Sequence, residues 1–290
     1  MTRDAARVDD LTVGMPTFED DPDVLVRSLD AIGAQGVTEP PLIVDSSRTE
    51  RVAEVVCPRE HVRYVRAREA TGVAESRNRI VELCRTRYLL FIDADAVPRP
   101  GWAAAMRRAF DRGDNVWLVG ARIVPVWKKP PPPLFDCIVA RELLGMLDLG
   151  SHTLEIPRVM GTSYAVDCRR VPEARPFDPR LGRRPDRLLS GEEVQLSLDV
   201  LSSGGRITYE PAATVEHHVR PERMRWRWML ARVYSEGRES RLWPQRLDPF
   251  PRRLGAADRV FQLVSTPAFL AGRWRGLNGR LTSCEGGESG

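Results

Sequence analysis

The sequence predicts an α/β fold, in which a mostly parallel central sheet carries helices on both faces and a helical extension follows at the C-terminus. Short apolar runs alternate with helical stretches through the first hundred residues, and this alternation is typical of a parallel α/β sheet. Carboxylates follow two of the apolar runs directly, at Asp45 and at the pair Asp93 and Asp95. Ligands of such sheets bind where the strands end, so these side chains are the first candidates for a functional site.

The elements of the first half can be followed along the chain. The apolar run at 11–18 predicts a buried strand that ends in a proline turn, and apolar residues at helical spacing over 24–32 predict the helix after it. The runs at 41–45 and 63–66 predict two more strands. A helical face over 73–84 then leads directly into the apolar segment YLLFIDAD, which we expect to form a central strand.

The second half is patterned less regularly. Four prolines at 130–133 interrupt the chain and open a loop-and-helix excursion that reaches residue 157. The other elements that the patterns predict are a helix at 101–110, strands at 116–124 and 159–166, a loop at 175–191, a helix at 192–201, two short strands around Pro211 and a basic aromatic helix, MRWRWMLARVY, after Pro221.

Composition limits the class of protein. With 42% hydrophobic and 29% charged residues over 290 positions, the chain can bury a sizeable core and is not expected to be disordered, fibrous or a membrane bundle. The 44 basic and 40 acidic residues leave a net charge of only +4, which gives little support to nucleic-acid binding. We therefore expect no nucleic-acid partner.

Cysteine usage and apolar segments bear on localisation. The five cysteines are scattered and form no C-x-x-C pair, which argues against a disulfide framework and fits a reducing compartment. The first ten residues lack the apolar core of a signal peptide. The uncharged stretch at 260–272 includes Pro267 and is shorter than the ~20 residues of a membrane span. We expect a cytoplasmic protein, with the inner face of the membrane as the alternative location.

The motif FIDAD carries the strongest chemical signal. Alternate residues of an extended chain point the same way, so Asp93 and Asp95 can face one divalent cation together. A metal held there would neutralise the charge of a bound diphosphate. The structural alternative is that both carboxylates merely end the strand or cap the helix that begins near Pro100.

Two further groups of polar residues come late in the chain. Glu192 and Glu193 follow Gly191 at the start of a predicted helix, where a pair of acids also suits the helix dipole. His217 and His218 follow a short strand. Adjacent strand residues face opposite ways, so at most one of the two histidines is expected to reach a common site. Taken singly, both groups also fit purely structural roles.

Taken together, these motifs resemble the family 2 nucleotide-sugar glycosyltransferases, which have a GT-A fold with a Rossmann-like sheet. VGMPTFEDDPDVLVRSLDAIGAQ is similar to the family's first strand, its P-T-[YF] turn and the helix that ends in Gln. LIVDSS is similar to its V-V-D-D-G-S, with Ser46 in place of the second aspartate, and GVAESRNRI to its G-x-x-x-x-R-N helix. GTSYAV, PFDPRLGRR, GEEVQL and YEPAATVEH follow in the family's order, with Ser163 where asparagine and Glu193 where aspartate are usual. The resemblance covers roughly residues 11–240.

The resemblance implies that residues of the first half bind the donor, a nucleotide-diphosphate sugar. The turn of Pro16, Thr17 and Phe18 would hold the nucleotide base and ribose together with Asp45. Arg77, in the R-N helix, would face the base or the diphosphate.

Metal-binding and catalytic roles are implied by the same resemblance. Asp95 and His217 would bind the divalent cation, Mn²⁺ or Mg²⁺, while Asp93 would contact the ribose or a metal-bound water. Glu193 would accept the proton of the acceptor hydroxyl in an inverting transfer, and Glu192 would support it by contacting the acceptor. That acceptor would be a lipid-linked or small-molecule sugar, so that a polysaccharide, a glycolipid and a natural product all remain open. Replacing aspartate by Glu193 lengthens the side chain by one methylene group and leaves the choice of base between the two glutamates open.

The motifs also divide the chain. The predicted parts are a disordered N-terminus at 1–10, a GT-A catalytic domain at 11–220 with a nucleotide-sugar-binding half (11–100) and an acceptor-binding half (101–220), a basic aromatic helix at 221–246 packed on the core, and a weakly ordered tail at 247–290. The aromatic helix has an alternative role on a membrane surface. Met224, Trp228 and Arg232 share a face that is not cleanly apolar, which favours packing on the domain.

Two rival functions fit parts of this pattern. A sugar-nucleotide pyrophosphorylase would need a glycine-rich basic loop after the first strand, where this chain has MPTFEDD. A catalytically degenerate relative or a basic nucleic-acid binder would not be expected to retain the D-x-D motif, the acid pair and the histidine together. The leading hypothesis is therefore a metal-dependent glycosyltransferase.

Overall fold

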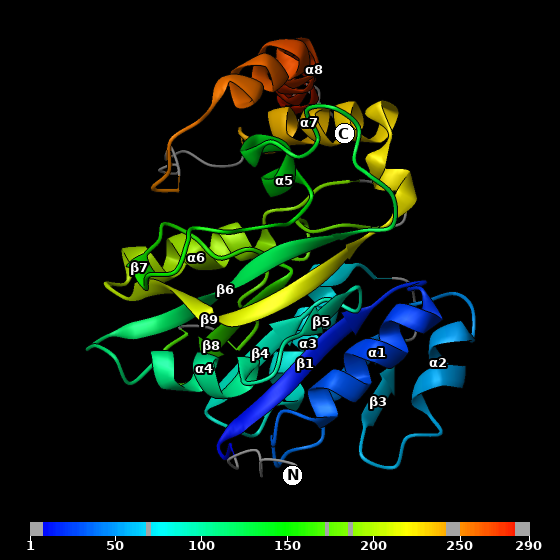
Figure 1. Cartoon of the computed structure of the whole chain (residues 1–290), viewed down its shortest axis with the longest axis vertical. Helices are drawn as coiled ribbons and strands as arrows, with labels where there is room; N and C mark the ends of the chain where they lie inside the picture. Colours follow the sequence, from blue (N-terminus) through cyan, green and yellow to red (C-terminus); the bar gives the residue numbers. More distant parts are fainter. Residues whose placement is uncertain (1–7, 68–70, 172–173, 185–187, 242–249, 282–290) are drawn as a thin grey trace, which may run out of the picture.

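The computed structural model of the chain describes residues 8–67, 71–171, 174–184, 188–241 and 250–281, with side chains as far as residue 275. Within these residues, nine strands form one sheet at the centre of the molecule (Figure 1). The strands are β1 (Leu11–Thr17), β2 (Leu42–Asp45), β3 (Arg63–Arg66), β4 (Tyr88–Ile92), β5 (Ala96–Pro98), β6 (Val116–Trp127), β7 (Leu154–Glu155), β8 (Ser163–Asp167) and β9 (Arg206–Val219). The helices are α1 (Pro22–Gly33), α2 (Arg51–Val56), α3 (Val73–Leu83), α4 (Trp102–Ala109), α5 (Ile138–Leu143), α6 (Glu192–Ser202), the 3₁₀ helix η1 (Pro221–Met224), α7 (Trp226–Glu239) and α8 (Ala256–Leu281).

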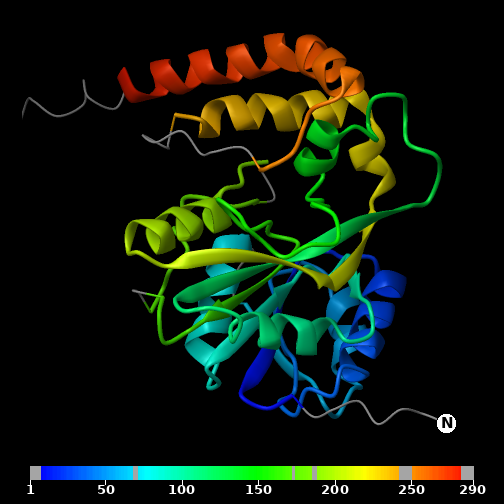
Figure 2. The ribbon, with the colours of Figure 1, turned by 60° about the vertical axis from the view of Figure 1, so that its left-hand side comes forward.

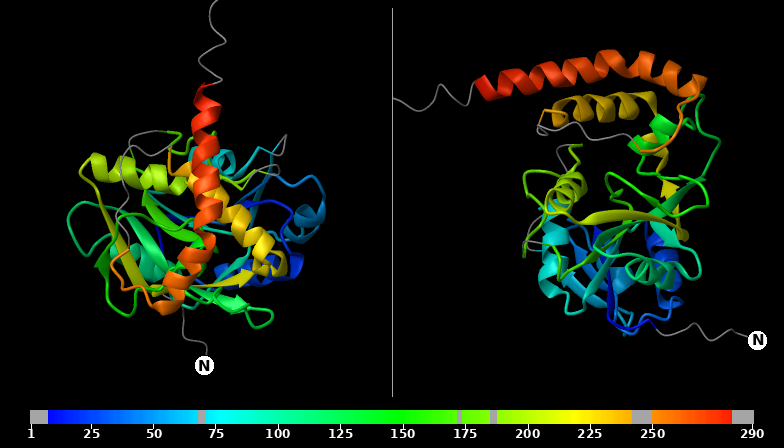
Figure 3. Two further views of the ribbon diagram at one scale, coloured as in Figure 1. Left: turned by 90° about the horizontal axis from the view of Figure 1, so that it is seen from above. Right: turned by 90° about the vertical axis from the view of Figure 1, so that its left-hand side faces the viewer.

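The sheet has the strand order β3-β2-β1-β4-β8-β6-β9-β5, with β7 paired to β9. Strand β1 pairs in parallel with β2 and β4, and β2 with β3. Strand β8 runs antiparallel to β4 and β6, β9 runs parallel to β6, and β5 and β7 run antiparallel to β9. Helices α1 and α4 cover one face of the sheet and α3 and α6 the other (Figures 1 and 3). The predicted α/β fold is confirmed, and the carboxyl ends of β1, β2 and β4 meet at one edge.

The parallel part of the sheet is buried on both faces. Strands β1 and β4 are buried along their whole length, which explains why their sequences are almost continuously apolar. Helix α3 lies close to β1 because Gly14 has no side chain: a Cβ there would overlap with Ile80 of α3. Arg77 is one turn earlier on α3, so this close packing brings it beneath the strand ends.

Strand β9 differs from the sequence prediction of two short strands around Pro211. It is one strand of 14 residues. Pro211 falls at an irregularity of the pairing with β6, between Glu210 and Thr214. An extra stretch of chain at such a bulge leaves the ladder, so the missing N–H of proline costs no hydrogen bond there.

The two ends of the chain also depart from the prediction. Residues 1–7 lie outside the described residues, but Val8, which was assigned to a disordered N-terminus, is buried and bridges to Val37. The predicted weakly ordered tail at 247–290 is wrong for residues Ala256–Leu281, which form the 26-residue helix α8; residues 242–249 and 282–290 are not described.

Helix α8 is ordered because it packs along α7. The ring of Trp226 on α7 lies 6.1 Å from that of Phe261 on α8 and 4.8 Å from that of Phe135 (centroid distances). The two helices approach closely at Gly237 and Gly272, since a Cβ on either glycine would overlap backbone of the other helix. Figures 2 and 3 show α8 as the outermost element, with α7 between it and the rest of the molecule. In the described part of the chain, none of the helices combines the length and apolarity needed to cross a bilayer.

Candidate active site

A cavity of about 540 Å³ opens at the carboxyl ends of β1 and β4. Its walls come from the turn after β1, the D-x-D segment after β4, the loop before α6, the start of α6, η1 and α7. Most of the residues that the sequence nominated lie on these walls. They are Pro16, Thr17, Phe18, Arg77, Asp93, Asp95, Glu192 and Glu193.

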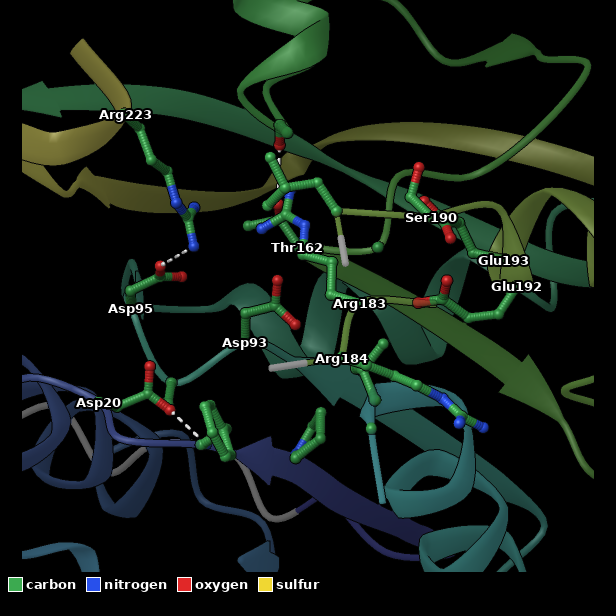
Figure 4. A pocket seen from close by; sticks show the side chains of 18 of the residues that line it. Asp20, Asp93, Asp95, Thr162, Arg183, Arg184, Ser190, Glu192, Glu193 and Arg223 are labelled. Atoms are coloured by element: carbon green, nitrogen blue, oxygen red, sulfur yellow. Dashed lines mark hydrogen bonds and ion pairs between the residues drawn. The ribbon is translucent and has the colours of Figure 1, made fainter. Parts of the chain in front are cut away.

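The acidic residues occupy two sides of this cavity. Figure 4 shows Asp20, Asp93 and Asp95 on one side and Glu192 and Glu193 on the other. The first group comes from loops that follow β1 and β4, and the second begins α6, far later in the chain. The fold therefore brings the D-x-D motif and the glutamate pair to one space.

Asp95 lies among two arginines and a histidine. Its Oδ1 is 3.3 Å from Nε2 of His217, and its Oδ2 is 3.3 Å from Nη2 of Arg223 and 3.8 Å from Nε of Arg220. The main-chain N–H of His218 donates a hydrogen bond of 2.8 Å to the carbonyl oxygen of Asp95. Burial alone would raise the pKa of Asp95, but His217 and Arg223 outweigh it and lower that pKa well below its usual range. Asp95 is therefore an ionised carboxylate.

Arg77 connects the two acidic sides. It is buried, and its guanidinium carbon lies 6.0 Å and 5.7 Å from the ring centroids of Phe91 and Tyr164. Its Nη2 donates a hydrogen bond of 3.1 Å to Oδ1 of Asp93, and its Nη1 pairs directly with Glu192. The sequence suggested that Arg77 faces a nucleotide. In the structure this guanidinium neutralises two carboxylates of the protein.

The two glutamates differ in their surroundings. Burial, reinforced by the charge of Glu193, raises the pKa of Glu192 to about 7, although Arg77 opposes that shift. Glu193 is half-buried. Its Oε2 has no hydrogen-bond partner in the described residues, and no ion pair joins its carboxylate to another described side chain. Gly161 makes room for the side chains of Glu193 and Arg77. A Cβ at this position would lie only 3.3 Å from Oε1 of Glu193 and 3.3 Å from Nη2 of Arg77. Glu193 thus has one oxygen without a hydrogen-bond partner in the described residues, although Arg77, Arg158 and Arg232 interact electrostatically with its carboxylate.

Asp45 lies outside the cavity. Its buried carboxylate accepts hydrogen bonds from Oγ1 of Thr17 (3.2 Å), the N–H of Ser47 (2.8 Å) and the hydroxyl of Tyr64 (2.7 Å), and Nη1 of Arg66 lies 2.8 Å away. The sequence suggested contact with the base or ribose, but β3 supplies donors that already engage this side chain. Asp45 instead fixes the turn after β1, which does line the cavity.

His217 also lies behind the wall of the cavity rather than on it. It is almost fully buried on β9, and its Nε2 faces Oδ1 of Asp95 at 3.3 Å and Nη1 of Arg223 at 3.5 Å. Its Nδ1 has no hydrogen-bond partner among the described residues.

Sequence reasoning missed Asp20. It follows the P-T-F turn, accepts a hydrogen bond of 2.9 Å from the N–H of Phe18 and pairs with Arg220. Burial raises its pKa to about 7, against the effect of Arg220. Its position in the segment EDD, directly after the first strand, was the available signal.

Apart from Arg77, sequence reasoning also missed the arginines that line the cavity. Arg183 points into the cavity (Figure 4), and burial together with the nearby Arg223 and Arg232 lowers its pKa to about 10. Arg220 belongs to the same group. In so arginine-rich a chain, no local pattern distinguishes these four residues from solvent-exposed arginines.

The residues around Asp95 fit a divalent cation shared with a diphosphate. Carboxylate and imidazole are both ligand types that Mn²⁺ accepts, and Asp95 and His217 bring them within 3.3 Å of each other. In the described residues, no group of three or more His, Cys, Asp or Glu side chains is arranged to hold a metal. The protein would therefore supply two ligands, and a diphosphate and water the remainder.

Known proteins resemble this chain in sequence. The sequence model of the family described as "Glycosyl transferase family 2" matches residues 12–158, about half of the chain. The glucosyl-dolichyl phosphate glucuronosyltransferase of Haloferax volcanii is 25% identical over 215 residues, which cover 69% of this chain and 68% of that protein. The pre-mycofactocin glycosyltransferase of Mycobacterium tuberculosis is 31% identical over 163 residues, which cover 53% of this chain but only 32% of that protein.

Solved structures share the fold. GalNAc-T7 with UDP, GalNAc and Mn²⁺ matches with a TM-score of 0.57 at 12% identity, over 88% of this chain and 54% of that one. The mannosyltransferase PcManGT of Pyrobaculum calidifontis, in complex with GDP-Man and Mn²⁺, matches with a TM-score of 0.56 at 15% identity, over 97% of this chain and 76% of that one. At such identities the likeness concerns the fold, and it confirms the expected GT-A class.

Replacing Arg77 by methionine should destabilise the protein in a pH-dependent way. Glu192 has a pKa of about 7 in the folded protein against 4.5 ordinarily, so the folded state loses stability as the pH rises through that interval. Without Arg77 this loss should deepen and extend to higher pH, because a buried carboxylate is left without a cation; the cost of breaking such a pair is about 3–5 kcal/mol.

The measurement is thermal unfolding of both proteins between about pH 5 and pH 8. The gap in Tm between wild type and Arg77→Met should widen as the pH rises. Arg79→Met is the matched control, since Arg79 is two residues away and half-exposed, and among the residues that the structure describes its ion pair is with Glu82. A gap that is independent of pH, or equal for the two variants, would contradict the assigned role of Arg77.

Proposed function

The chain belongs to glycosyl transferase family 2, whose members are nucleotide-sugar transferases, and we propose that it carries out a metal-dependent, inverting transfer to an acceptor hydroxyl. The observation that supports this proposal best is the sharing of one cavity by Asp93, Asp95, Glu192 and Glu193. Leaving-group charge develops at one side of a glycosyl transfer and a proton is lost at the other, so the reaction needs two such centres.

The donor is proposed to lie along the side formed by the ends of β1 and β4. Pro16, Thr17 and Phe18 would contact the base and ribose, and Asp93 the ribose or a water molecule. Asp95 and His217 would hold Mn²⁺ or Mg²⁺, which when bound supplies positive charge to the leaving diphosphate.

Arginines of the cavity would add to the charge at the diphosphate. The side chain of Arg183 points into the cavity, and Arg223 lies 3.3 Å from Asp95. A guanidinium can donate two parallel hydrogen bonds to phosphate oxygens. Both residues are therefore proposed to orient the diphosphate.

The acceptor is proposed to enter on the side of α6. Its hydroxyl must lose a proton as it attacks the anomeric carbon from the face opposite the leaving diphosphate, and a positioned carboxylate can accept that proton. Glu193 suits this role because its Oε2 has no hydrogen-bond partner within the described residues. Glu192 is held by Arg77 and would brace the start of α6.

Glu192 is the alternative base. Its pKa of about 7 lies near the working pH, where general-base catalysis is most effective. Its pairing with Arg77 and its deep burial argue against proton transfer from a substrate.

The names of two relatives suggest a lipid-linked or a small-molecule acceptor, and residues 101–220 are proposed to select it. Retention of both acid groups speaks against a degenerate protein, and the lack of a glycine-rich basic loop after β1 against a pyrophosphorylase.

Donor binding should depend on a divalent ion and on Asp95. A thermal-shift screen of UDP-, GDP- and dTDP-sugars with Mn²⁺ should give one donor that raises Tm. Asp95→Ala should abolish the Mn²⁺-dependent part of that shift, whereas Asp111→Ala, at an exposed ion pair with Arg107, should leave it unchanged. A Mn²⁺-dependent shift of full size in Asp95→Ala would refute the metal assignment.

Glu193→Gln should stop turnover without loss of donor binding. The amide keeps the size of the side chain and removes its basicity, so kcat should fall by roughly 10²-fold or more while the donor Kd changes little. Glu192→Gln is the comparison, and it should retain more activity. The product's anomeric configuration, read by NMR, should be inverted. Retention, or an inactive Glu192→Gln beside an active Glu193→Gln, would overturn this assignment.

A further inference from the structure

The outermost helix, α8, carries an exposed apolar face. Six of the seven large hydrophobic residues that are exposed in the described part of the chain lie between 254 and 274. None of the residues that line the cavity belongs to α8, so these exposed residues are not part of the active site. The most exposed are Leu263 at 76%, Trp274 at 61% and Leu270 at 56%. Exposed apolar residues that gather on one element indicate an interaction surface.

The spacing of these residues places them on one side of the helix. At 3.6 residues per turn, the positions 260, 263, 264, 267, 270, 271 and 274 fall within an arc of about 120°, and all seven are apolar. This apolar face of α8 is distinct from the face that packs on α7, which holds Phe261, Ser265 and Gly272. The helix thus has one apolar side toward the protein and a second one toward solvent.

The charges around the apolar face have one sign. Arg259 and Arg273 border it on one side and Arg275 on the other, and all three are exposed. Between residues 254 and 275 the sequence holds a single acid, Asp258. That side chain is buried and accepts hydrogen bonds from the N–H groups of Gly255 (2.8 Å) and Val139 (2.9 Å). Between residues 254 and 275, no exposed acid therefore offsets the arginines of α8.

This charge pattern selects between the possible occupants. A second copy of the chain would bring the same arginines face to face without an acid to pair with them. A membrane that contains acidic phospholipids offers apolar acyl chains for the apolar face and anionic headgroups for the arginines on its flanks. Tryptophan at one end of the face, Trp274, is also a residue that favours the level of the headgroups.

We propose that α8 lies flat in the surface of an anionic membrane, with its apolar face inserted and Arg259, Arg273 and Arg275 at the headgroups. The outer position of α8 in Figures 2 and 3 leaves this face clear of the rest of the molecule. The sequence suggested α7 as an alternative membrane helix. In the structure its Trp226 packs against Phe135 and Phe261 within the protein. The proposal does not depend on the reaction proposed above.

Co-sedimentation of the full chain with vesicles tests the proposal. The protein should bind vesicles of phosphatidylcholine with phosphatidylglycerol, more weakly at high salt, and should bind phosphatidylcholine alone much less. The triple variant Leu263→Ser, Leu270→Ser, Trp274→Ser should lose binding by at least about tenfold. Leu201→Ser removes an exposed apolar residue, with 40% of its surface accessible, from α6 and should bind as wild type.

A second variant and the molecular mass complete the test. Arg259→Gln, Arg273→Gln, Arg275→Gln keeps the apolar face and should remove the preference for the anionic vesicles. All six changes are at exposed positions, so Tm should stay close to that of wild type. The proposal fails if wild type binds neither vesicle, if the serine variant binds as wild type, or if light scattering shows a dimer that the serine variant dissolves.

Discussion

The ion pairs of the buried Arg77 are the interaction on which the site depends. A guanidinium removed from water is stable only if it is paired, and so is a buried carboxylate. Arg77 meets both requirements, since it contacts Asp93 at the end of β4 and Glu192 at the start of α6. The rings of Phe91 on β4 and Tyr164 on β8 lie beneath its guanidinium and contact it from the side of the sheet. One side chain therefore ties together two acidic segments that would otherwise repel each other.

This arrangement separates two kinds of carboxylate within one cavity. Asp95 is kept ionised by His217 and Arg223, which suits a group that faces a cation. Glu192 is buried, and its pKa is raised to about 7. Its charged form is stabilised by the ion pair with Arg77 and not by solvent. Glu193, next to it, keeps a carboxylate without an ion pair in the described residues. A catalytic site needs such a difference between groups of the same type, and here burial and pairing create it.

The sequence was informative where a strand ends and less so where contacts are long-range. Apolar runs followed by Asp93 and Asp95 predicted both the sheet and the position of the cavity, because a parallel sheet gathers its strand ends. Asp45 followed the same rule and yet is engaged by Tyr64 and Arg66, which only the pairing of β2 with β3 reveals. Apart from Arg77, the arginines of the cavity were not predicted, since their role arises from tertiary placement. Helix α8 was missed because Pro267 and its second apolar face obscure the usual one-sided pattern.

The coupling between Arg77 and Glu192 is the most direct test of this account. A double-mutant cycle of Arg77→Met and Glu192→Gln, measured by denaturant unfolding near neutral pH, isolates it from the effects of each change alone. The account predicts that Glu192→Gln offsets much of the loss caused by Arg77→Met, with a coupling free energy of about 1–3 kcal/mol. Stabilities that add to within about 0.5 kcal/mol would contradict it, because two groups that respond independently cannot hold the walls of the cavity together.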